Sequence, residues 1–398
     1  MPGRVAGKIK VRAVAGFLKE KGKSAAGISA SLLNPRPQNY PVNFPAGISH
    51  SCGGAFRPQP SGLDLFRCFS QTGLDMKAKI TTTIPVRNGQ EFILQTLQSL
   101  AAQTLRPDRV IVLDNLSTDA TPEIVKGFKE LPVEFVSNPK DLGFIGNYNR
   151  CLDFAAETEY LQILHADDVL RPEFYEVLTR HLNDCPGRAM GWCLDERIDK
   201  HNRRLSISGR PDDRVIVLDR DIFLARKAEI GNQSFCATLL KTNYQPVPDR
   251  FPMDMLVYGD MVYWARFGAH SDKIVLINRP LAQYRWHNTN MSVFVAPNLK
   301  SLVVDAWSTM QMAEALRKKP PGIIRRMKLK GLMAVRCGIM AKRFRQLGNL
   351  PYSRQIVKTG RGYTGLPLWL AGQILVQLRE LLVFKIGRRP RHRQNIFS

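Results

Sequence analysis

The sequence has few acidic residues, and it lacks the cysteine pattern and the long apolar runs that define several protein classes. Its 398 residues include 34 acidic and 58 Lys or Arg side chains, for a formal net charge of +24. The seven cysteines form no Cys-x-x-Cys pair. They therefore do not indicate a zinc site or a disulfide framework, and a reducing cytosol suits them. We find no secretory signal with a proper apolar segment and no clean apolar span of about 18 residues.

The positive charge is concentrated at the two ends of the chain. Residues 1–75 carry roughly +7 and residues 299–398 roughly +18, which leaves roughly −1 for residues 76–298. A high net charge is compatible with nucleic-acid binding, but the central part is nearly neutral and shows no recognised nucleic-acid module. We therefore expect a globular domain between two basic flanks and no specific nucleic-acid partner.

Residues 1–75 are rich in Gly, Pro, Ser and Ala and show no sustained hydrophobic periodicity. This composition predicts a disordered or weakly structured basic extension. Ordered patterning begins at Met76, so one hypothesis is that Met76 is the true start of the protein. The alternative is a transit-type or basic tail.

From residue 80 onward, apolar strands alternate with amphipathic helices. The expected strands are Ile80–Val86, Val110–Leu113, Val133–Val136 and Tyr160–Leu164. Helices are expected to start at Asn88–Glu91, at Thr121–Glu123 and at Arg171–Glu173, and to cover Phe144–Ala156. This alternation predicts an α/β fold with a doubly wound, mostly parallel sheet, in which ligands bind beyond the carboxyl ends of the strands.

The second half of the chain is expected to complete this domain and to add a helical extension. Further strands are predicted at Met190–Leu194, Ser234–Leu240, Lys273–Asn278 and Leu281–Trp286, with a helix inside Phe251–Ser271. Beyond residue 299 we expect basic amphipathic helices such as Gly322–Gln346. The segment Leu366–Ile386 is apolar but interrupted by Arg379 and Glu380, so it should lie in a membrane interface rather than span it. The basic tail at residues 387–393 would suit anionic headgroups.

Four short stretches carry the residues that indicate chemistry. They are, in chain order, Ile84–Gly89 (IPVRNG), Val112–Asp119 (VLDNLSTD), Leu164–Asp168 (LHADD), and Gly259–Asp260 followed by Tyr284–His287 (YRWH). In this order and spacing they resemble the family 2 glycosyltransferases, over roughly residues 78–295. The resemblance implies a GT-A fold, with a Rossmann-like central sheet flanked by helices. It also implies an inverting enzyme with a nucleotide-sugar donor and a divalent metal, Mg²⁺ or Mn²⁺.

A histidine and two adjacent carboxylates follow the strand expected at Tyr160–Leu164. Ionised carboxylates are costly to bury unless they are paired or bind a cation, so this stretch is either a solvated turn or a metal site. By the resemblance, Asp167 is the second Asp of the family's Asp-x-Asp motif and a direct metal ligand, while His165 replaces the first. His287 stands where some members of the family supply another metal ligand. It could equally be a structural histidine that closes the loop over the site.

Other residues of these stretches are candidates for binding the donor. The loop Pro85–Gly89 should present backbone N–H groups at a helix start, which favours phosphate, although a plain capped turn has the same pattern. Asp114 could accept a hydrogen bond from the base or ribose. Arg87 and Arg285 could each contact phosphate, or be a solvated arginine and a core salt-bridge partner, respectively. The nucleotide-sugar-binding candidates are Pro85, Val86, Arg87, Asn88, Asp114, Ser117, Gly143, Asn147, Ala166 and Asp168.

Asp260 is the candidate catalytic residue. It follows Gly259 where the family typically has Glu-Asp, so the resemblance makes Asp260 the general base that takes a proton from the acceptor hydroxyl. A carboxylate in a buried cleft, with a raised pKa, suits this role. A residue that caps the helix beginning there is the alternative, and one side chain can do both.

Together these features predict an inverting glycosyltransferase that moves a sugar from a nucleotide diphosphate-sugar to a hydroxyl acceptor. The basic flanks suggest a protein that is peripheral at the cytoplasmic face of the plasma membrane, with a glycan or lipid-linked acceptor in cell-envelope or surface glycan synthesis. One alternative is a nucleotidyltransferase, although Pro85–Gly89 poorly matches a triphosphate-binding loop. Another is a non-catalytic nucleotide-sugar-binding or scaffold protein.

Overall fold

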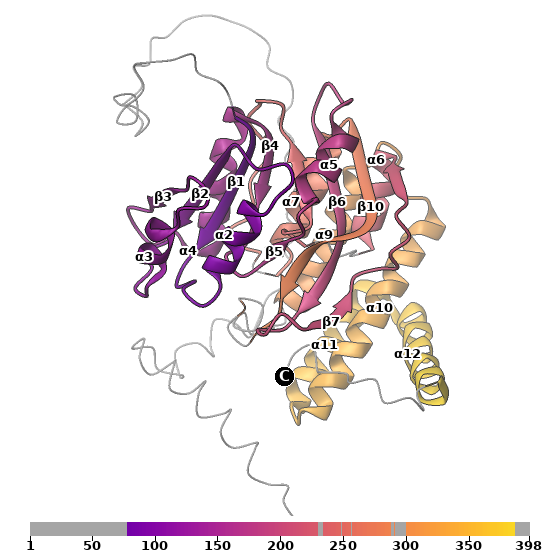
Figure 1. Ribbon diagram of the computed structural model, residues 1–398. Coiled ribbons are helices and arrows are strands. Elements are labelled where there is room, and N and C mark those ends of the chain that lie inside the picture. The colour runs from indigo at the N-terminus through magenta and orange to yellow at the C-terminus, as the bar shows by residue number, and fades with distance from the viewer. Residues whose placement is uncertain are drawn as a thin grey trace, which may run out of the picture. The chain divides into compact units, whose positions relative to one another are not determined.

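The computed structural model describes residues 78–229, 234–247, 249–255, 257–287, 290 and 300–386. The extension expected at residues 1–75 and the basic tail at residues 387–393 lie outside the described residues. All described residues belong to one compact unit. Helices cover both faces of its central sheet (Figure 1).

Ten strands of the described residues form one mixed sheet. In spatial order they are β3 (Glu134–Ser137), β2 (Arg109–Asp114), β1 (Ala78–Val86), β4 (Thr158–Ile163), β9 (Thr238–Lys241), β6 (Ala189–Ile198), β10 (Lys273–Arg285) and β5 (Val169–Leu170), with β7 (Arg204–Ile207) beside β6 and β8 (Val215–Leu218) beside β10. The neighbours β3, β2, β1 and β4 are parallel, and so are β6 and β10. The antiparallel strand β9 joins these two parallel halves. The carboxyl ends of β1, β2 and β4 therefore meet at one edge of the sheet.

Two apolar cores, one on each side of the sheet, hold the helices in place. Buried residues of α2 (Ile93–Ala101), α3 (Thr121–Gly127) and α5 (Phe174–Leu182) form one core with the strands. The other core contains residues of α4 (Gly143–Cys151), the 3₁₀ helix η2 (Leu152–Glu157), α6 (Arg220–Ala228), α7 (Gly259–Ala269) and α9 (Ala306–Ala315). Because both faces are covered, β2 is apolar and buried from Val110 to Leu113, which is the pattern expected of a parallel strand inside an α/β protein.

The C-terminal helices share the second core. The π-helical turn η3 (Lys300–Asp305) leads into α9, which is followed by α10 (Ile323–Gln346), α11 (Leu350–Thr364) and α12 (Leu366–Ile386). Met333 of α10, Ile356 of α11 and Trp369 of α12 are buried in the same cluster as strand residues of β2 and β4. Arg325 of α10 also lies 2.7 Å from the buried carboxylate of Glu314 and forms an ion pair with Glu229 at the end of α6. These helices lie against one another in Figure 1.

The sequence prediction differs from the structure at several element boundaries. The helix expected to begin at Asn88–Glu91 begins at Ile93, because Asn88 takes a left-handed conformation with φ 56° and belongs to a turn. Of the strand expected at Ser234–Leu240, only Thr238 onward is extended. The two strands expected on either side of residue 280 form the single strand β10, whose register shifts around Pro280. No helix in the described part of the chain is both long and apolar enough to cross a membrane.

Candidate active site

A cavity of about 1120 Å³ opens at the carboxyl ends of β1 and β4. Its wall is built from the loop after β1, the first turns of α4, the loop 165–167, the segment 255–260, the end of β10, and α10. Ten of the residues predicted to act on substrate or metal line it: Pro85, Val86, Arg87, Asn88, Gly143, Asn147, Ala166, Asp167, Asp260 and His287. Three others, Asp114, Ser117 and Asp168, lie behind the wall and are not part of the lining.

The loop after β1 is held by the loop after β2. The amide of Asn88 donates to the Ser117 hydroxyl at 2.8 Å, and the amide of Gly89 donates to the Thr121 hydroxyl at 2.8 Å. The Asn88 side chain in turn accepts from the amide of Thr118 at 2.8 Å. These amides were expected to face a phosphate, but here they fix the turn, because side-chain oxygens of the neighbouring loop reach them first. Ser117 therefore does not line the cavity itself, but holds the backbone of Asn88, which does.

Asp114 ends β2 and turns away from the cavity. Its carboxylate accepts from the amide of Ser117 at 3.2 Å and lies 3.5 Å from the Ser137 hydroxyl. The next residue, Asn115, lines the cavity in its place and donates to Asp141 at 2.8 Å. Leu116 adopts φ 61°, which allows this tight turn where the family usually has Gly. The sequence reasoning selected Asp114 and missed Asn115, although both follow the same strand.

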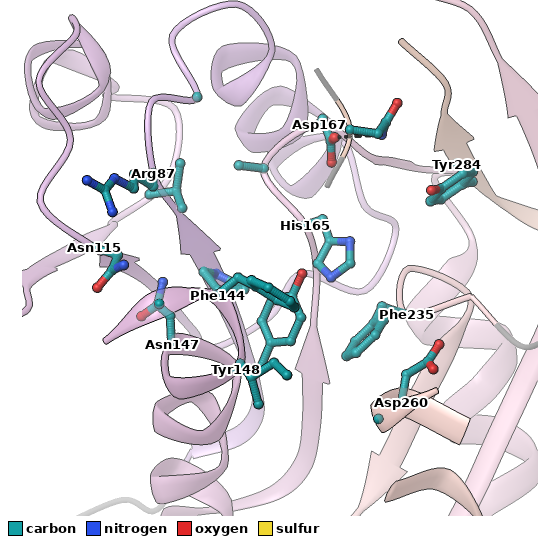
Figure 2. A pocket seen from close by; sticks show the side chains of 18 of the residues that line it. Arg87, Asn115, Phe144, Asn147, Tyr148, His165, Asp167, Phe235, Asp260 and Tyr284 are labelled. Carbon is teal, nitrogen blue, oxygen red and sulfur yellow. Dashed lines mark hydrogen bonds between the residues drawn. The ribbon is translucent and has the colours of Figure 1, made fainter. Parts of the chain in front are cut away.

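Arg87, which lines the cavity (Figure 2), forms an ion pair with Asp141. Both side chains are about half exposed. The pKa of Asp141 is lowered to about 2 by hydrogen bonds from the Gly143 amide, Arg87 and Asn115. Asn147 is buried, donating to the Leu113 carbonyl at 2.9 Å and accepting from Asn138 at 2.9 Å. A network of carboxylate, guanidinium and amide groups thus shapes this end of the cavity.

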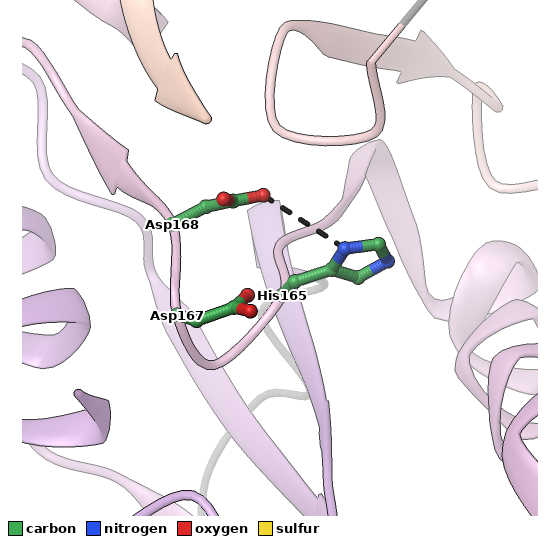
Figure 3. A group of neighbouring side chains, drawn as sticks. All are labelled: His165, Asp167 and Asp168. Atoms are coloured by element: carbon green, nitrogen blue, oxygen red, sulfur yellow. Dashed lines mark ion pairs between the residues drawn. The ribbon is translucent and has the colours of Figure 1, made fainter. Parts of the chain in front are cut away.

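The loop after β4 brings an imidazole and two carboxylates together. His165, Asp167 and Asp168 each place a ligand atom within 4.8 Å of the others (Figure 3). Asp167 accepts from the ring of His287 at 2.9 Å. Asp168 is fully buried, and one of its carboxylate oxygens accepts from the Arg285 amide at 2.9 Å. Burial and the neighbouring charge of Asp167 raise the pKa of Asp168 well above its usual range.

The chemistry of this loop fits a divalent cation. Within the described residues, His165 Nε2 and Asp168 Oδ2 are buried polar atoms that have no hydrogen-bond partner. The ring nitrogen of His287 and the carboxylate oxygen of Asp167 are 2.9 Å apart. Two ligands at right angles around an octahedral ion, each about 2.1 Å from it, lie about 3 Å apart. Carboxylate oxygen with imidazole nitrogen suits Mn²⁺ better than Mg²⁺.

Arg285 supports the loop after β4, which carries Asp167 and Asp168, from inside the protein. It is fully buried, and its guanidinium donates to the Asp167 carbonyl at 2.8 Å, to Asn202 at 2.6 Å and to Gln95 at 2.9 Å. It also stacks over Phe92, with Cζ 4.6 Å from the ring centroid. It does not line the cavity, as a phosphate contact would. It also forms no core salt bridge within the described residues, because the oxygens that accept from its guanidinium are neutral. It ties β10 to the loop that carries Asp167.

Two aromatic rings pack against His165 in the middle of the cavity wall. Tyr148 stacks on it with the ring planes 16° apart and the centroids 5.2 Å apart, and Phe235 lies on it at 4.6 Å. Figure 2 shows His165 beside these two rings, which also contact each other with their centroids 5.2 Å apart. Burial by the rings lowers the pKa of His165, so the imidazole is neutral near pH 7. Neither Tyr148 nor Phe235 carries a sequence signal that distinguishes it from an ordinary core aromatic residue.

Asp260 lies in the first turn of α7 and points into the cavity (Figure 2). One of its oxygens accepts from the amide of the next residue, Met261, at 2.7 Å, whereas the N-cap of α7 is Tyr258 and no side chain caps this helix. Burial raises the pKa of Asp260 to about 6, against the opposing effects of this hydrogen bond and of the positive charge of Lys227. Lys227 is 4% exposed, with its ammonium 5.4 Å from the Phe223 ring centroid. Asp260 is thus a carboxylate that can hold a proton near neutral pH.

Comparisons with known proteins agree with this arrangement. The model of the family described as "Glycosyl transferase family 2" matches residues 81–243. That segment is therefore similar to glycosyl transferase family 2. The putative glycosyltransferase EpsH of Bacillus subtilis is 26% identical over 106 residues, which cover 26% of this chain and 30% of that protein. The succinoglycan biosynthesis protein ExoO of Rhizobium meliloti is 27% identical over 100 residues, covering 25% of this chain and 28% of that protein.

The structural comparison extends the likeness beyond the family segment. TarS residues 1–349 of Staphylococcus aureus, solved in complex with UDP-GlcNAc, align with a TM-score of 0.53 and 13% identity over 78% of this chain and 92% of that one. The GT-A fold predicted from the four motifs is therefore confirmed, with helices following the sheet domain. The alignments to EpsH and ExoO span less than a third of those proteins.

Proposed function

We propose that the protein is an inverting glycosyltransferase that transfers a sugar from a nucleotide diphosphate-sugar to a hydroxyl group of an acceptor. The observation that carries the proposal is the pairing of two sites on one cavity. Asp167 and His287 offer cation ligands at one position, and Asp260, with its pKa of about 6, offers a base at another. The match of residues 81–243 to the model of glycosyl transferase family 2 supports the same reaction class.

In this proposal the donor lies along the loops after β1 and β4. Pro85, Val86, Asn88, Gly143, Asn147 and Ala166 line that part of the cavity. Arg87 can exchange its exposed carboxylate partner for a phosphate oxygen, because a rim ion pair has a low net stability. Asp114, Ser117 and Asp168 contribute from behind by fixing the two loops. TarS, which shares the fold, was solved with UDP-GlcNAc, in keeping with a nucleotide-sugar donor.

Asp167 and His287 would hold a divalent cation, and such an ion supplies electrostatic stabilisation of the departing diphosphate. The ring of His165 stays neutral beside Tyr148 and Phe235, so it can face the donor without adding charge. Arg285 keeps Asp167 in place through its carbonyl group.

Asp260 performs the proton transfer in the proposed reaction. The acceptor oxygen forms a bond to the anomeric carbon from the side opposite the diphosphate, and the bond between that carbon and the diphosphate oxygen breaks. The proton of the acceptor hydroxyl passes to the Asp260 carboxylate, and the nucleotide diphosphate leaves. This single displacement inverts the anomeric centre and needs no covalent enzyme intermediate.

We place the reaction in cell-envelope or surface glycan synthesis, with peripheral membrane contact through the C-terminal helices. The similarity to a succinoglycan biosynthesis protein supports the glycan role. The surface of α12 supports the membrane contact, since Leu366, Leu370 and Ile374 recur every four residues and are each about half exposed. Exposed basic side chains of the neighbouring helix α11, among them Arg354 and Lys358, would face anionic headgroups.

The test is calorimetric titration of the full-length chain with UDP, GDP, CDP, ADP and TDP, with and without Mn²⁺. One nucleotide should bind in a metal-dependent way, and Asp167→Asn should weaken that binding by at least about tenfold, since even residues that only support a metal ligand contribute about that much. Asp153→Asn, which removes an exposed carboxylate remote from the loop, is the matched control.

A second variant separates catalysis from binding. Asp260→Asn should bind the same nucleotide with unchanged affinity, but should slow sugar transfer and donor hydrolysis by about a hundredfold or more. Full activity in this variant would favour the alternative of a non-catalytic nucleotide-sugar-binding protein. Nucleotide binding that ignores both Mn²⁺ and Asp167→Asn would contradict the metal site.

A further inference from the structure

An arginine from the C-terminal helices forms part of the cavity wall. Arg336 lies in α10, outside the family segment 81–243, and lines the cavity together with Met340 of the same helix. It contacts Tyr258 of the same wall, and Asp260 also lines the cavity. The C-terminal extension therefore contributes directly to the site that contains the proposed base.

The guanidinium of Arg336 has no anionic partner among the described residues. It donates a hydrogen bond to the hydroxyl of Tyr258, and its Cζ lies 5.2 Å from the centroid of that ring. Its Nε is buried and has no hydrogen-bond partner. Elsewhere in α10, Arg325 forms ion pairs with both Glu229 and Glu314. Arg336 differs from Arg325 in that no carboxylate of the described residues lies within ion-pair distance of it.

Such an arrangement is unfavourable unless an anion joins it. Burial lowers the pKa of Arg336, but a guanidinium stays charged at any pH at which the protein is folded. Arg336 is partly buried, and an uncompensated charge held away from water is unfavourable until a ligand supplies the opposite charge. The planar fork of donors in arginine matches the oxygens of a phosphate or a carboxylate.

The position of Arg336 indicates which substrate carries this anion. Its hydrogen-bond partner Tyr258 is separated from Asp260 by a single residue, Gly259. Figure 2 shows Asp260 well apart from Arg87 and Asp167, the residues proposed to face the donor diphosphate. Arg336 therefore contacts the segment at the start of α7 that also carries the proposed base, which favours an anion of the acceptor over the leaving group.

We propose that Arg336 binds an anionic group of the acceptor, a phosphate ester or a carboxylate, next to the hydroxyl that Asp260 deprotonates. The inference rests on the proposed transferase function and narrows its acceptor to anionic glycans or glycan phosphates. The concentration of basic side chains in residues 299–398, roughly +18 in sum, would also favour the approach of such an acceptor.

The experiment measures binding of inorganic phosphate, glucuronate and glucose to the full-length protein by calorimetry. Each probe is titrated into the free protein and into protein saturated with its nucleotide diphosphate and Mg²⁺. We expect phosphate or glucuronate to bind in both states, with glucose at least about tenfold weaker. Arg336→Gln should weaken the anion by about tenfold or more, as loss of a charge-assisted hydrogen bond predicts. Arg326→Gln, an exposed arginine of the same helix, should change nothing.

The affinity for the nucleotide distinguishes the possible failures. Unchanged nucleotide affinity in Arg336→Gln, with weakened anion binding, supports the proposal, provided that the variant keeps the thermal unfolding midpoint of the wild type. Unchanged anion binding in this variant, no anion binding by the wild type, or equal binding of glucose would overturn it. A parallel loss of nucleotide and anion binding would assign Arg336 to the donor and also overturn it. If no nucleotide binds the wild type while phosphate still does, the transferase proposal fails but the anion site stands.

Discussion

Asp168 and Asp260 are carboxylates of the same site whose surroundings raise both pKa values but give them different tasks. Asp168 is fully buried beside the charge of Asp167, and it accepts from the backbone of Arg285. Asp260 faces the cavity, with a pKa of about 6 and Lys227 as the nearby positive charge. A group that releases its proton near pH 6 is suited to general-base catalysis at neutral pH, whereas Asp168 is suited to hold the loop.

The rate of sugar transfer should therefore depend on pH through Asp260. The carboxylate must be unprotonated to act, so kcat/KM should fall by about tenfold per pH unit below about pH 6. Lys227→Met removes the positive charge that lowers the pKa of Asp260. The fall of kcat/KM on the acid side of the pH profile, its acid limb, should therefore move to higher pH. The pH profile of kcat/KM measures this shift. Arg226→Met, an exposed neighbour on α6, should leave the profile unchanged, and an unmoved limb in Lys227→Met would refute the coupling.

Sequence reasoning found the residues whose chemistry is visible in their type and position. Asp167, Asp260 and His287 follow strands or start a helix, and all three line the cavity. It missed Tyr148, because an aromatic residue in an amphipathic helix looks like any core residue. It also missed Arg336, because its position depends on how α10 packs about 170 residues after the loop that carries Asp167.

At the scale of whole elements, burial decides which predictions agree with the structure. β2 is apolar from Val110 to Leu113, and β1 and β4 are buried over Ile80–Val86 and Tyr160–Ile163 although they include Thr and Gln, so the positions of all three were predicted to within a few residues. The start of α2 was misplaced because Asn88 and Gly89 bond to the loop after β2, and a local sequence pattern contains no information on that partner. The same holds for β10, whose strand pairing with β6 continues past the interruption at Pro280.

The outer face of α12 allows a prediction about membrane contact at the scale of a single helix. The double variant Leu370→Ser with Ile374→Ser removes two half-exposed apolar side chains, so it should reduce co-sedimentation of the protein with vesicles of anionic lipid by several fold. Val217→Ser, a comparably exposed apolar residue on β8, is the control. Equal sedimentation of all three proteins would contradict a membrane contact through α12, and binding to neutral vesicles alone would contradict the role of charge.

At the scale of the whole molecule, charge and packing divide the chain differently. The net charge changes near residue 299, where a nearly neutral region gives way to a strongly basic one. The apolar core shows no such boundary, because Met310, Met333 and Trp369 pack into the same cluster as Leu161 of β4 and Trp264 of α7. The domain division expected from composition at residue 299 is therefore a division of surface charge, and we propose that the helices after it are part of the folding unit.

Truncation tests this proposal. A chain ending at residue 298 would lose the buried apolar side chains of α9 to α12, each of which contributes about 1.5–3 kcal/mol when fully buried, and would expose Trp264 and Phe267 behind the cavity. Since small globular domains are stabilised by only about 5–15 kcal/mol in total, we expect the truncated chain to lose cooperative thermal unfolding and to bind the dye ANS. Removal of residues 387–398 alone is the control and should leave the unfolding midpoint unchanged. A cooperative transition of the 1–298 chain near the wild-type midpoint would instead make the C-terminal helices a separate domain that docks on a self-sufficient sheet.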